Sequence, residues 1–270
     1  MKFSVLMSLY IKEQSNYLYE SLESLYNQTK PADEIVIVYD GPVGDELTGV
    51  ISYWMEKLPI KVVRLTENVG LGKALNFGLY HCSHEYIARM DTDDICVPKR
   101  FEYQLSAFNE DPELILVGGN IIEFEGSIDQ LLSARVVPES NQSITRFIKK
   151  RNPFNHMTVM FKKKEIILAG GYMDHHFMED YNLWLRCVSL KYKVENINNV
   201  LVYARAGQSM ISRRSGVKYI KSEYDLMNIK VSLGIDNKVN AFFCFLLRSS
   251  TRVLPTPILA KMYRKILRSN

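Results

Sequence analysis

The chain has 270 residues, of which 47% are hydrophobic and 24% are charged, and its formal net charge is +4. These values are typical of a globular protein that buries a substantial core, as one large domain or two closely joined halves. No stretch reaches the roughly 18 apolar residues of a transmembrane helix, and the N-terminal apolar run ends at Met7, too early for a signal peptide. The four cysteines form no CxxC pair, which disfavours a zinc site or a disulfide framework and favours a reducing cytosol.

Strands and helices alternate regularly in the first part of the chain. Short apolar runs that suit buried strands are separated by segments in which apolar residues recur at helical spacing. We expect strands at residues 3–8, 34–39, 60–64 and 86–90, and helices at residues 17–26, 47–57, 72–80 and 98–109. This alternation predicts a doubly wound α/β sheet with right-handed crossovers.

The pattern loosens after the fourth helix. We expect further strands at residues 114–118, 121–124, 157–161, 193–196 and 200–204, and helices at 139–150, from 164, and at 179–190. Two more helices, 216–233 and 239–247, are expected in a C-terminal part rich in Lys and Arg. The expected division is an α/β domain at 1–205, with halves 1–105 and 106–205, and a basic helical extension at 206–270.

The most informative stretch is an apolar run that meets three carboxylates. Residues 86–90 suit a buried strand, and Asp91, Asp93 and Asp94 follow at its carboxyl end, where open α/β sheets bind ligands. Neighbouring carboxylates repel one another unless a cation lies among them, and Mg²⁺ and Mn²⁺ favour oxygen ligands and bridge to phosphates. The motif predicts a metal and diphosphate site; the alternative is an acidic loop that caps a helix opened by Pro98.

Two other strand ends carry residues that suit a nucleotide. Tyr10 offers a ring that can stack on a nucleobase, and Asp40 offers a carboxylate to a base imide or a ribose hydroxyl. A turn tyrosine packed on the next helix, and ordinary turn chemistry at residues 40–42, are the competing explanations. Residues 68–78 form a glycine-containing segment at the start of a helix, and its backbone amides and Lys73 can bind an anion. An ordinary loop that leads into a helix explains the same spacing.

A second acidic pair opens a later helix. Glu179 and Asp180 follow a glycine-containing, partly aromatic loop, and the dipole of the helix stabilises their ionised form. A carboxylate held ionised at the edge of a crevice suits a general base for a sugar hydroxyl; a charge placed there for the dipole alone is the alternative. His156, His175 and His176 are candidate metal ligands, but such histidines are more often hydrogen-bonded polar residues.

Taken in order, these segments resemble the family 2 glycosyltransferases of the GT-A fold. The resemblance covers residues 3–205 and rests on segments 5–10, 38–41, 68–78, 91–94 and 179–186. Residues 155–160 and 170–172 further resemble the branch that builds bacterial O-antigen and exopolysaccharide repeat units, including the amylovoran-type transferases. The family implies a Rossmann-like α/β fold of the GT-A type, with a mixed, mainly parallel sheet flanked by helices.

The resemblance also implies roles for residues at matching positions. Asp180 is expected to be the catalytic base, and Glu179 to position the base or the acceptor. Asp93 is expected to ligate Mn²⁺ or Mg²⁺, and Asp91 to hold the ribose or a metal-bound water. Expected contacts to the nucleotide sugar come from Ser8, Tyr10, Asp40, Lys73, Asp91, Arg213 and Arg214, and those to the acceptor from His156 and Trp184. Some relatives place a histidine after the last strand; residues 203–209 hold none, and Gln208 or water is expected to substitute.

We therefore expect an inverting, metal-dependent hexosyltransferase of polysaccharide repeat-unit synthesis. The expected donor is a UDP-sugar with glucose or galactose, and the expected acceptor is an N-acetylhexosamine on undecaprenyl diphosphate, joined through a β-1,3 linkage. The C-terminal part combines an apolar run at 242–247 with basic residues; such an end can lie on an anionic leaflet, and a core-packing helix with a solvated basic end is the alternative. We expect a bacterial cytoplasmic protein, peripheral at the inner membrane.

Other functions are weighed against this one. A sugar-phosphate nucleotidyltransferase would carry a glycine-rich, arginine-containing loop where this chain has residues 8–12. A non-catalytic nucleotide-sugar-binding homologue is disfavoured by the intact carboxylates. A nucleic-acid binder is suggested by the basic tail alone, and no nucleic-acid motif accompanies it. A transferase with another nucleotide sugar or acceptor stays the alternative.

Overall fold

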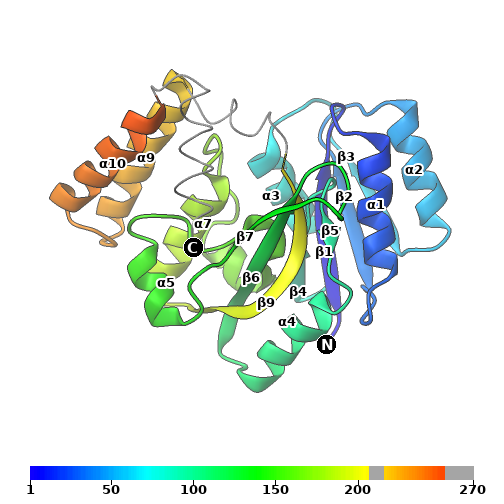
Figure 1. Cartoon of the computed structure of the whole chain (residues 1–270), viewed down its shortest axis with the longest axis horizontal. Coiled ribbons are helices and arrows are strands. Elements are labelled where there is room, and N and C mark those ends of the chain that lie inside the picture. The colour runs from blue at the N-terminus through cyan, green and yellow to red at the C-terminus, as the bar shows by residue number, and fades with distance from the viewer. Residues whose placement is uncertain (207–215, 253–270) are drawn as a thin grey trace.

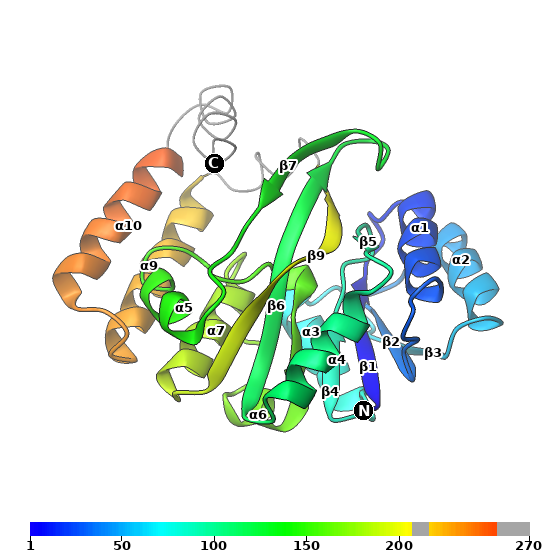
Figure 2. The same ribbon diagram turned by 60° about the horizontal axis from the view of Figure 1, so that its bottom comes forward.

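A mixed nine-stranded β-sheet runs through the centre of the computed structural model, which describes residues 1–206 and 216–252 (Figure 1). The strand order is β3-β2-β1-β4-β8-β6-β9-β5, and β7 pairs with β6 outside this path. Helices cover both faces of the sheet, as the two views in Figures 1 and 2 show. The predicted α/β fold with a mixed sheet flanked by helices is therefore confirmed.

The first four strands are parallel and bring their carboxyl ends to one edge of the sheet. They are β3 (Ile60–Arg64), β2 (Glu34–Tyr39), β1 (Phe3–Leu9) and β4 (Tyr86–Arg89). Nearly every residue of β1 and β2 is buried, as expected for strands that are covered on both faces. The bounds of all four agree with the predicted strands to within one residue.

Two hydrophobic cores lie on opposite faces of this sheet. One is covered by α1 (Ser15–Tyr26), α2 (Asp45–Met55) and α4 (Arg100–Glu110). The other is covered by α3 (Leu71–His81), α5 (Asn141–Phe147), α6 (Lys163–Leu168) and α7 (Glu179–Ser189). Because successive strand residues point to opposite faces, β2 supplies Ile37 to the first core and Val38 to the second. Pro98 does not open α4, which begins two residues later.

The second half of the sheet is built on a long parallel pair. β6 (Leu114–Phe124) and β9 (Lys193–Arg205) pair along most of their length. The 3₁₀-helix η1 (His156–Thr158) leads into β8 (Met160–Lys162), which runs antiparallel between β4 and β6. Two strands were not predicted: β5 (Ile95–Cys96), antiparallel to β9, and β7 (Leu131–Arg135), antiparallel to β6.

The strands predicted separately at 114–118 and 121–124 form the single strand β6, and those at 193–196 and 200–204 form β9. Gly118 and Gly119 explain the difference in β6, because glycine usually weakens a strand. Here a Cβ on Gly118 would lie 2.2 Å from Asn196 Oδ1, and one on Gly119 would lie 2.6 Å from Leu201 Cδ1. Close packing against β9 requires these glycines, and strand β6 continues through both of them.

Two helices, α9 (Val217–Ser232) and α10 (Lys238–Arg252), pack against each other at one end of the molecule (Figure 1). α9 also contacts α7 and contributes Tyr219 and Leu226 to the core on that face. This part of the predicted extension is therefore built onto the α/β fold. Arg213, Arg214 and Gln208, for which roles were predicted, lie outside the described residues, as does segment 253–270.

We predict that Gly78→Val destabilises the fold. α3 lies so close to the sheet that a Cβ on Gly78 would be 2.5 Å from Val38 Cγ2 and 2.6 Å from Leu6 Cδ1. Overpacking of this kind costs about 1–3 kcal/mol, which urea unfolding measures. Gly49→Ala in α2 is the matched control, because a Cβ there meets nothing within 4 Å and alanine favours a helix over glycine by about 1 kcal/mol. Equal stability of the two variants would contradict the tight packing of α3.

Candidate active site

The carboxyl ends of β1, β2 and β4 meet at one edge of the sheet. The backbone N–H of Asp40 donates to the Leu9 carbonyl (2.8 Å), and that of Met90 donates to the Leu6 carbonyl (3.1 Å). These bonds bring the residues that leave the three strands close together. The sequence-predicted residues at this edge are Ser8, Tyr10, Asp40 and Asp91, of which Ser8 and Tyr10 are partly exposed. Their roles toward a nucleotide remain predictions.

Asp91, Asp93 and Asp94 form a compact acidic cluster directly after β4. One carboxylate oxygen from each lies within 4.8 Å of the others; Asp91 and Asp93 are partly exposed, and Asp94 is buried. Arg205, at the end of β9, holds this loop through its backbone N–H to Asp94 Oδ1 (2.8 Å) and its Nε to the Asp93 carbonyl (3.0 Å). The pairing of β5 with β9 adds to this anchorage.

The cluster fits a divalent cation. Burial, followed by the charges of Asp91 and Glu13, raises the pKa of Asp93 to about 7. Burial and the neighbouring carboxylates also raise the pKa of Asp94, whose Oδ2 has no hydrogen-bond partner. Hard cations such as Mn²⁺ and Mg²⁺ bind oxygen donors of this kind. Among the described residues, no other group of three His, Cys, Asp or Glu side chains is close enough to hold a metal.

Asp40 caps the loop that precedes α3. Its carboxylate accepts the backbone N–H groups of Val69 (2.7 Å) and Gly70 (3.1 Å). The side-chain amide of Asn68 adds a third bond at 3.0 Å. Gly41 permits this approach, because its φ is 85° and a Cβ there would lie 2.8 Å from the Asn68 nitrogen. Since a carboxylate has about four acceptor positions, these three bonds leave one position of Asp40 unused.

Lys73 lies in the first turn of α3, and its ammonium group is bound to the loop before α7. It pairs with Asp174 at 2.8 Å, and the two side chains are 55% and 68% exposed. The hydrogen bond from Lys73 lowers the pKa of Asp174. An exposed pair of this kind is worth at most about 1 kcal/mol, so an anionic ligand competes readily for Lys73.

Glu179 and Asp180 occupy the first turn of α7, where the helix dipole favours negative charge. Asp180 Oδ1 accepts the N–H of Tyr181 (2.7 Å), and Oδ2 accepts the side-chain amide of Asn152 (2.6 Å). Burial nevertheless raises the pKa of Asp180, and burial together with the charge of Asp180 raises that of Glu179 to about 7. The pair therefore holds one negative charge more readily than two, and the two donors favour that charge on Asp180.

The two acidic groups converge on one site. The charge of Asp91 contributes to the raised pKa of Glu179, because the two carboxylates lie close enough to repel. α3 packs against α7, and a Cβ on Gly72 would lie 3.0 Å from the Cβ of Glu179. Arg89 pairs with Asp91, and its charge also acts to lower the pKa of Asp93 and of Asp180. The acids that the sequence singled out in two distant segments thus share one place in the fold.

Three residues of the site were missed in the sequence. Arg89 lies inside the segment that was described as an apolar run, 86–90, yet its buried guanidinium pairs with Asp91 at 2.5 Å. A charge within a buried strand was the available signal. Asn152 and Arg205 lie in segments without a recognisable motif, so no local pattern marks them.

The residues predicted at the acceptor side take different places. His156 is partly exposed, with Nε2 at 3.0 Å from the Tyr172 hydroxyl, and burial lowers its pKa so that the ring is neutral. Trp184 is fully buried in the core under the site, which corrects the predicted contact with an acceptor. His175 is also buried, with Nε2 at 2.9 Å from the Ser222 carbonyl, and this favours a hydrogen-bonded polar residue over a metal ligand.

Comparison with known proteins places this site in a family. The model for Glycosyl transferase family 2 matches residues 4–167. The chain is 48% identical to the amylovoran biosynthesis glycosyltransferase AmsE of Erwinia amylovora, over 97% of this chain and 98% of that protein. It is 38% identical to an Escherichia coli protein, UDP-Gal:alpha-D-GlcNAc-diphosphoundecaprenol beta-1,3-galactosyltransferase, over 99% of this chain and 97% of that one.

A solved structure supports the fold. The mannosyltransferase PcManGT from Pyrobaculum calidifontis, in complex with GDP-Man and Mn²⁺, superposes with a TM-score of 0.63 at 16% identity, covering 99% of this chain and 81% of that one. This likeness agrees with the predicted GT-A fold. Because the family model spans more than half of the chain and two relatives match it nearly end to end, the chain belongs to glycosyl transferase family 2.

Proposed function

We propose that this glycosyltransferase moves a hexose, galactose or glucose, from a UDP-sugar to an N-acetylhexosamine carried on a lipid diphosphate, with inversion and a β-1,3 linkage. Support comes from the E. coli relative, whose name gives UDP-Gal, GlcNAc-diphosphoundecaprenol and a beta-1,3 linkage. The likeness to AmsE of amylovoran biosynthesis supports a role in exopolysaccharide or O-antigen repeat-unit synthesis.

The observation that carries the proposal is the meeting of two acidic groups in different environments. The carboxylates of Asp91, Asp93 and Asp94 are crowded at the strand ends, and Asp94 Oδ2 has no hydrogen-bond donor. Asp180, by contrast, is fixed by donors on both of its oxygens. Glycosyl transfer requires two different environments. Negative charge that develops on the leaving diphosphate has to be stabilised, and a base has to take the proton of the acceptor.

On the donor side, residues at the strand ends bind and orient the nucleotide. Tyr10 offers its ring to the uracil, with Ser8 close by, and the remaining acceptor position of Asp40 suits the base. Lys73 meets the diphosphate. Asp91 keeps one oxygen for the ribose or the cation, because the other is paired with a buried arginine.

Mn²⁺ or Mg²⁺ is the cofactor that we assign to the first group, with Asp93 and Asp91 as its ligands. When bound, such a cation supplies Lewis-acid stabilisation of a diphosphate. The raised pKa of Asp93 and the unpartnered Oδ2 of Asp94 support this assignment. The Mn²⁺ in the complex of the P. calidifontis neighbour agrees with it.

On the acceptor side, Asp180 is the proposed base. Its carboxylate takes the proton of the acceptor hydroxyl, whose oxygen forms the new bond to the anomeric carbon. The bond from that carbon to the diphosphate oxygen breaks, and UDP leaves with the electron pair. Attack opposite the leaving group inverts the anomeric centre, so an α-linked donor gives a β-linkage. Glu179 and the neutral ring of His156 are placed to orient the acceptor.

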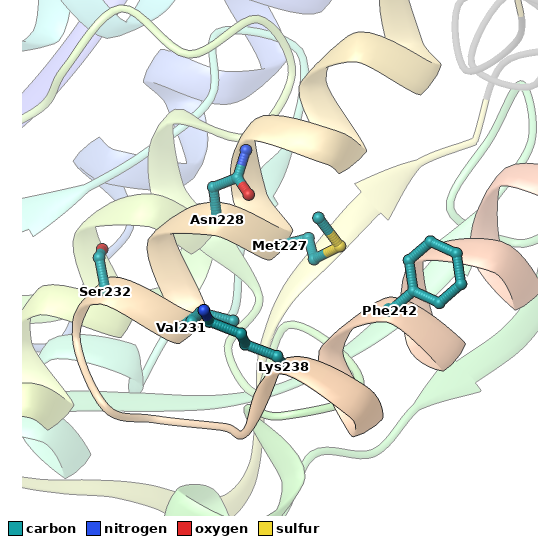
Figure 3. Close-up of a pocket in the computed structure, with 6 residues that line it drawn as sticks. All are labelled: Met227, Asn228, Val231, Ser232, Lys238 and Phe242. Carbon is teal, nitrogen blue, oxygen red and sulfur yellow. The ribbon is translucent and has the colours of Figure 1, made fainter.

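α10 presents the surface that we assign to membrane contact. Apolar residues recur along it at helical spacing and are exposed, namely Val239, Phe242, Phe243, Leu246 and Leu247. A helix of a soluble protein normally buries such a stripe. In Figure 3, Phe242 and Lys238 lie at a groove between α9 and α10 that is also lined by Met227, Asn228, Val231 and Ser232.

Along the described ranges, 1–206 and 216–252, no helix has the length and apolar character needed to cross a bilayer. We place the protein at the cytoplasmic face of the bacterial inner membrane because the acceptor named for the E. coli relative is carried on undecaprenol.

We predict transfer from UDP-Gal or UDP-Glc to a synthetic lipid-diphosphate GlcNAc or GalNAc in the presence of Mn²⁺, measured by product mass and by the NMR coupling that reports a β-linkage. Asp180→Asn should lower turnover by about 10²–10⁴-fold, the usual contribution of a general base, while UDP still binds with Mn²⁺. Asp93→Ala is the reciprocal variant, in which UDP binding should lose its dependence on Mn²⁺.

Asp129→Asn, in the exposed turn between β6 and β7, is the matched control and should leave transfer unchanged. Turnover of Asp180→Asn near that of the wild type would place the base elsewhere. Failure of the wild type to release UDP from any donor, with any of these acceptors, would reject the proposed function.

We predict that the double variant Phe243→Glu, Leu247→Glu loses flotation with phosphatidylglycerol-containing vesicles. The two side chains are 59% and 70% exposed, so the charges are accommodated in the fold but repelled by an anionic, apolar surface. The double variant Tyr80→Glu, Leu168→Glu is the matched control, because these side chains are similarly exposed, at 58% and 67%, on α3 and α6. Equal flotation of both double variants would contradict the assignment of α10.

A further inference from the structure

The segment that follows α5, residues 148–152, brings a side chain to the proposed base. Asn152 donates from its amide nitrogen to Asp180 Oδ2 at 2.6 Å. The amide oxygen of the same side chain accepts the backbone N–H of Phe154 at 3.2 Å. Because this second bond needs the oxygen on the side of Phe154, the amide presents its donor to Asp180. Residues 148–152 are called the Asn152 loop below.

Side chains from three different helices hold the Asn152 loop by its backbone. They donate to three consecutive carbonyl oxygens, namely that of Ile148 from the hydroxyl of Tyr181 on α7 (2.6 Å), that of Lys149 from Nζ of Lys230 on α9 (2.9 Å) and that of Lys150 from Nη1 of Arg248 on α10 (3.2 Å). Loop carbonyls have to find their partners in side chains or water. Here two of the three partners come from the C-terminal helices.

The two donors on the C-terminal helices are themselves fixed. Arg248 forms two hydrogen bonds to the carboxylate of Glu223 on α9, at 2.7 and 2.8 Å, and Glu223 is buried. Lys230 is only 3% exposed. Burial, followed by the charge of Arg248, lowers the pKa of Lys230 to about 8, so the ammonium group lies where its charge is costly. Its hydrogen bond to the Lys149 carbonyl offsets part of that cost.

The Asn152 loop limits how the carboxylate of Asp180 can turn. The hydrogen bond on Oδ1 comes from the backbone N–H of the next residue, Tyr181, whereas the bond on Oδ2 comes from outside α7. A general base has to lie within about 2.6–3.2 Å of the atom that gives up the proton. The donor from the loop is therefore suited to keep the carboxylate at that distance.

We propose that Asn152, Lys230 and Arg248 are positioning residues for the proposed base. The two basic residues hold the Asn152 loop from α9 and α10, and the loop in turn holds the carboxylate of Asp180. This inference rests on the proposed role of Asp180, and none of the three residues needs to contact the sugar. Both helices lie beyond residues 4–167, which the family model matches.

The test is a double-mutant cycle on kcat for the full chain, at saturating Mn²⁺ and UDP-sugar, with a short-chain lipid-diphosphate acceptor and no vesicles. Leaving out the membrane removes any effect of α10 on membrane binding. Asn152→Ala should lower kcat by up to about 10²-fold, because a small misplacement of a reacting group can cost that much. Lys230→Met should lower kcat by a smaller factor. In the double variant, Lys230→Met should have no further effect, because the loop no longer holds Asp180.

Lys163→Met is the matched control. Lys163 also donates from Nζ to a backbone carbonyl, that of Cys82 at 2.7 Å, just after α3. This variant should keep the kcat of the wild type. The affinity for UDP in the presence of Mn²⁺ should be the same in all variants, because the strand ends that carry the donor side are unchanged.

The cycle distinguishes positioning from other effects. A general loss of structure, or a direct effect of the Lys230 charge on the base, would lower kcat in the Asn152→Ala background as well. Such an additive effect, or a kcat near that of the wild type in either single variant, overturns the inference and leaves the proposed function intact. Absence of transfer by the wild type counts against the function and against the inference that rests on it.

A second variant replaces Lys230→Met in the cycle if that variant does not fold. Arg248→Lys keeps a positive charge beside Glu223, but its single ammonium group takes the place of the three nitrogens that bond Glu223 and the Lys150 carbonyl. Its effect on kcat should also disappear in the Asn152→Ala background. An effect of Arg248→Lys that persists there overturns the inference.

Discussion

At the edge of the parallel strands, acidic side chains outnumber the buried positive charges, and the site depends on this imbalance. Five carboxylates, Asp91, Asp93, Asp94, Glu179 and Asp180, gather in this region, and the buried guanidinium of Arg89 pairs with one of them, Asp91. Because these acids are crowded and at most partly exposed, they are not all readily ionised without further cations or hydrogen-bond donors. Asp94 keeps one oxygen without a donor, which suits a cation, whereas Asp180 has a donor on each oxygen, which suits a base. This difference in hydrogen bonding distinguishes the proposed donor side of the site from the proposed acceptor side.

Distant parts of the chain hold this arrangement in place. Arg205 fixes the acidic loop from the end of β9, and α3 approaches Glu179 where Gly72 leaves room. The C-terminal helix α9 reaches the same region. Tyr181, next to the proposed base, donates its hydroxyl to the Ile148 carbonyl (2.6 Å). The ammonium group of Lys230 on α9 lies over the Tyr181 ring, 4.9 Å from the ring centroid. α10 packs against α9, which in turn contacts α7, the helix with the proposed base.

The sequence predicted the parts of this structure that depend on local pattern. The apolar runs and helical spacing located the first four strands and their crossover helices, and the order of the acidic motifs led to the right family. Errors arose where long-range packing decides the outcome. The glycines of β6 serve contact with β9, and β5 forms only because β9 runs beside it. Trp184 faces the core although its helix begins with the acidic pair Glu179 and Asp180. Arg89 was overlooked because its segment was interpreted as an apolar run, and its burial and its pairing with Asp91 are seen only in the fold.

The central claim is that both acidic groups act on one bound donor and acceptor. The most direct measurement is a crystal structure with UDP, Mn²⁺ and a soluble disaccharide-length acceptor analogue, with the metal located by anomalous scattering. The account predicts an anomalous peak against Asp93, the uracil over Tyr10, and an acceptor hydroxyl within roughly 2.6–3.2 Å of Asp180, the hydrogen-bond reach of a base. A metal and UDP bound away from the ends of β1, β2 and β4, or an acceptor with no hydroxyl near Asp180, would contradict it.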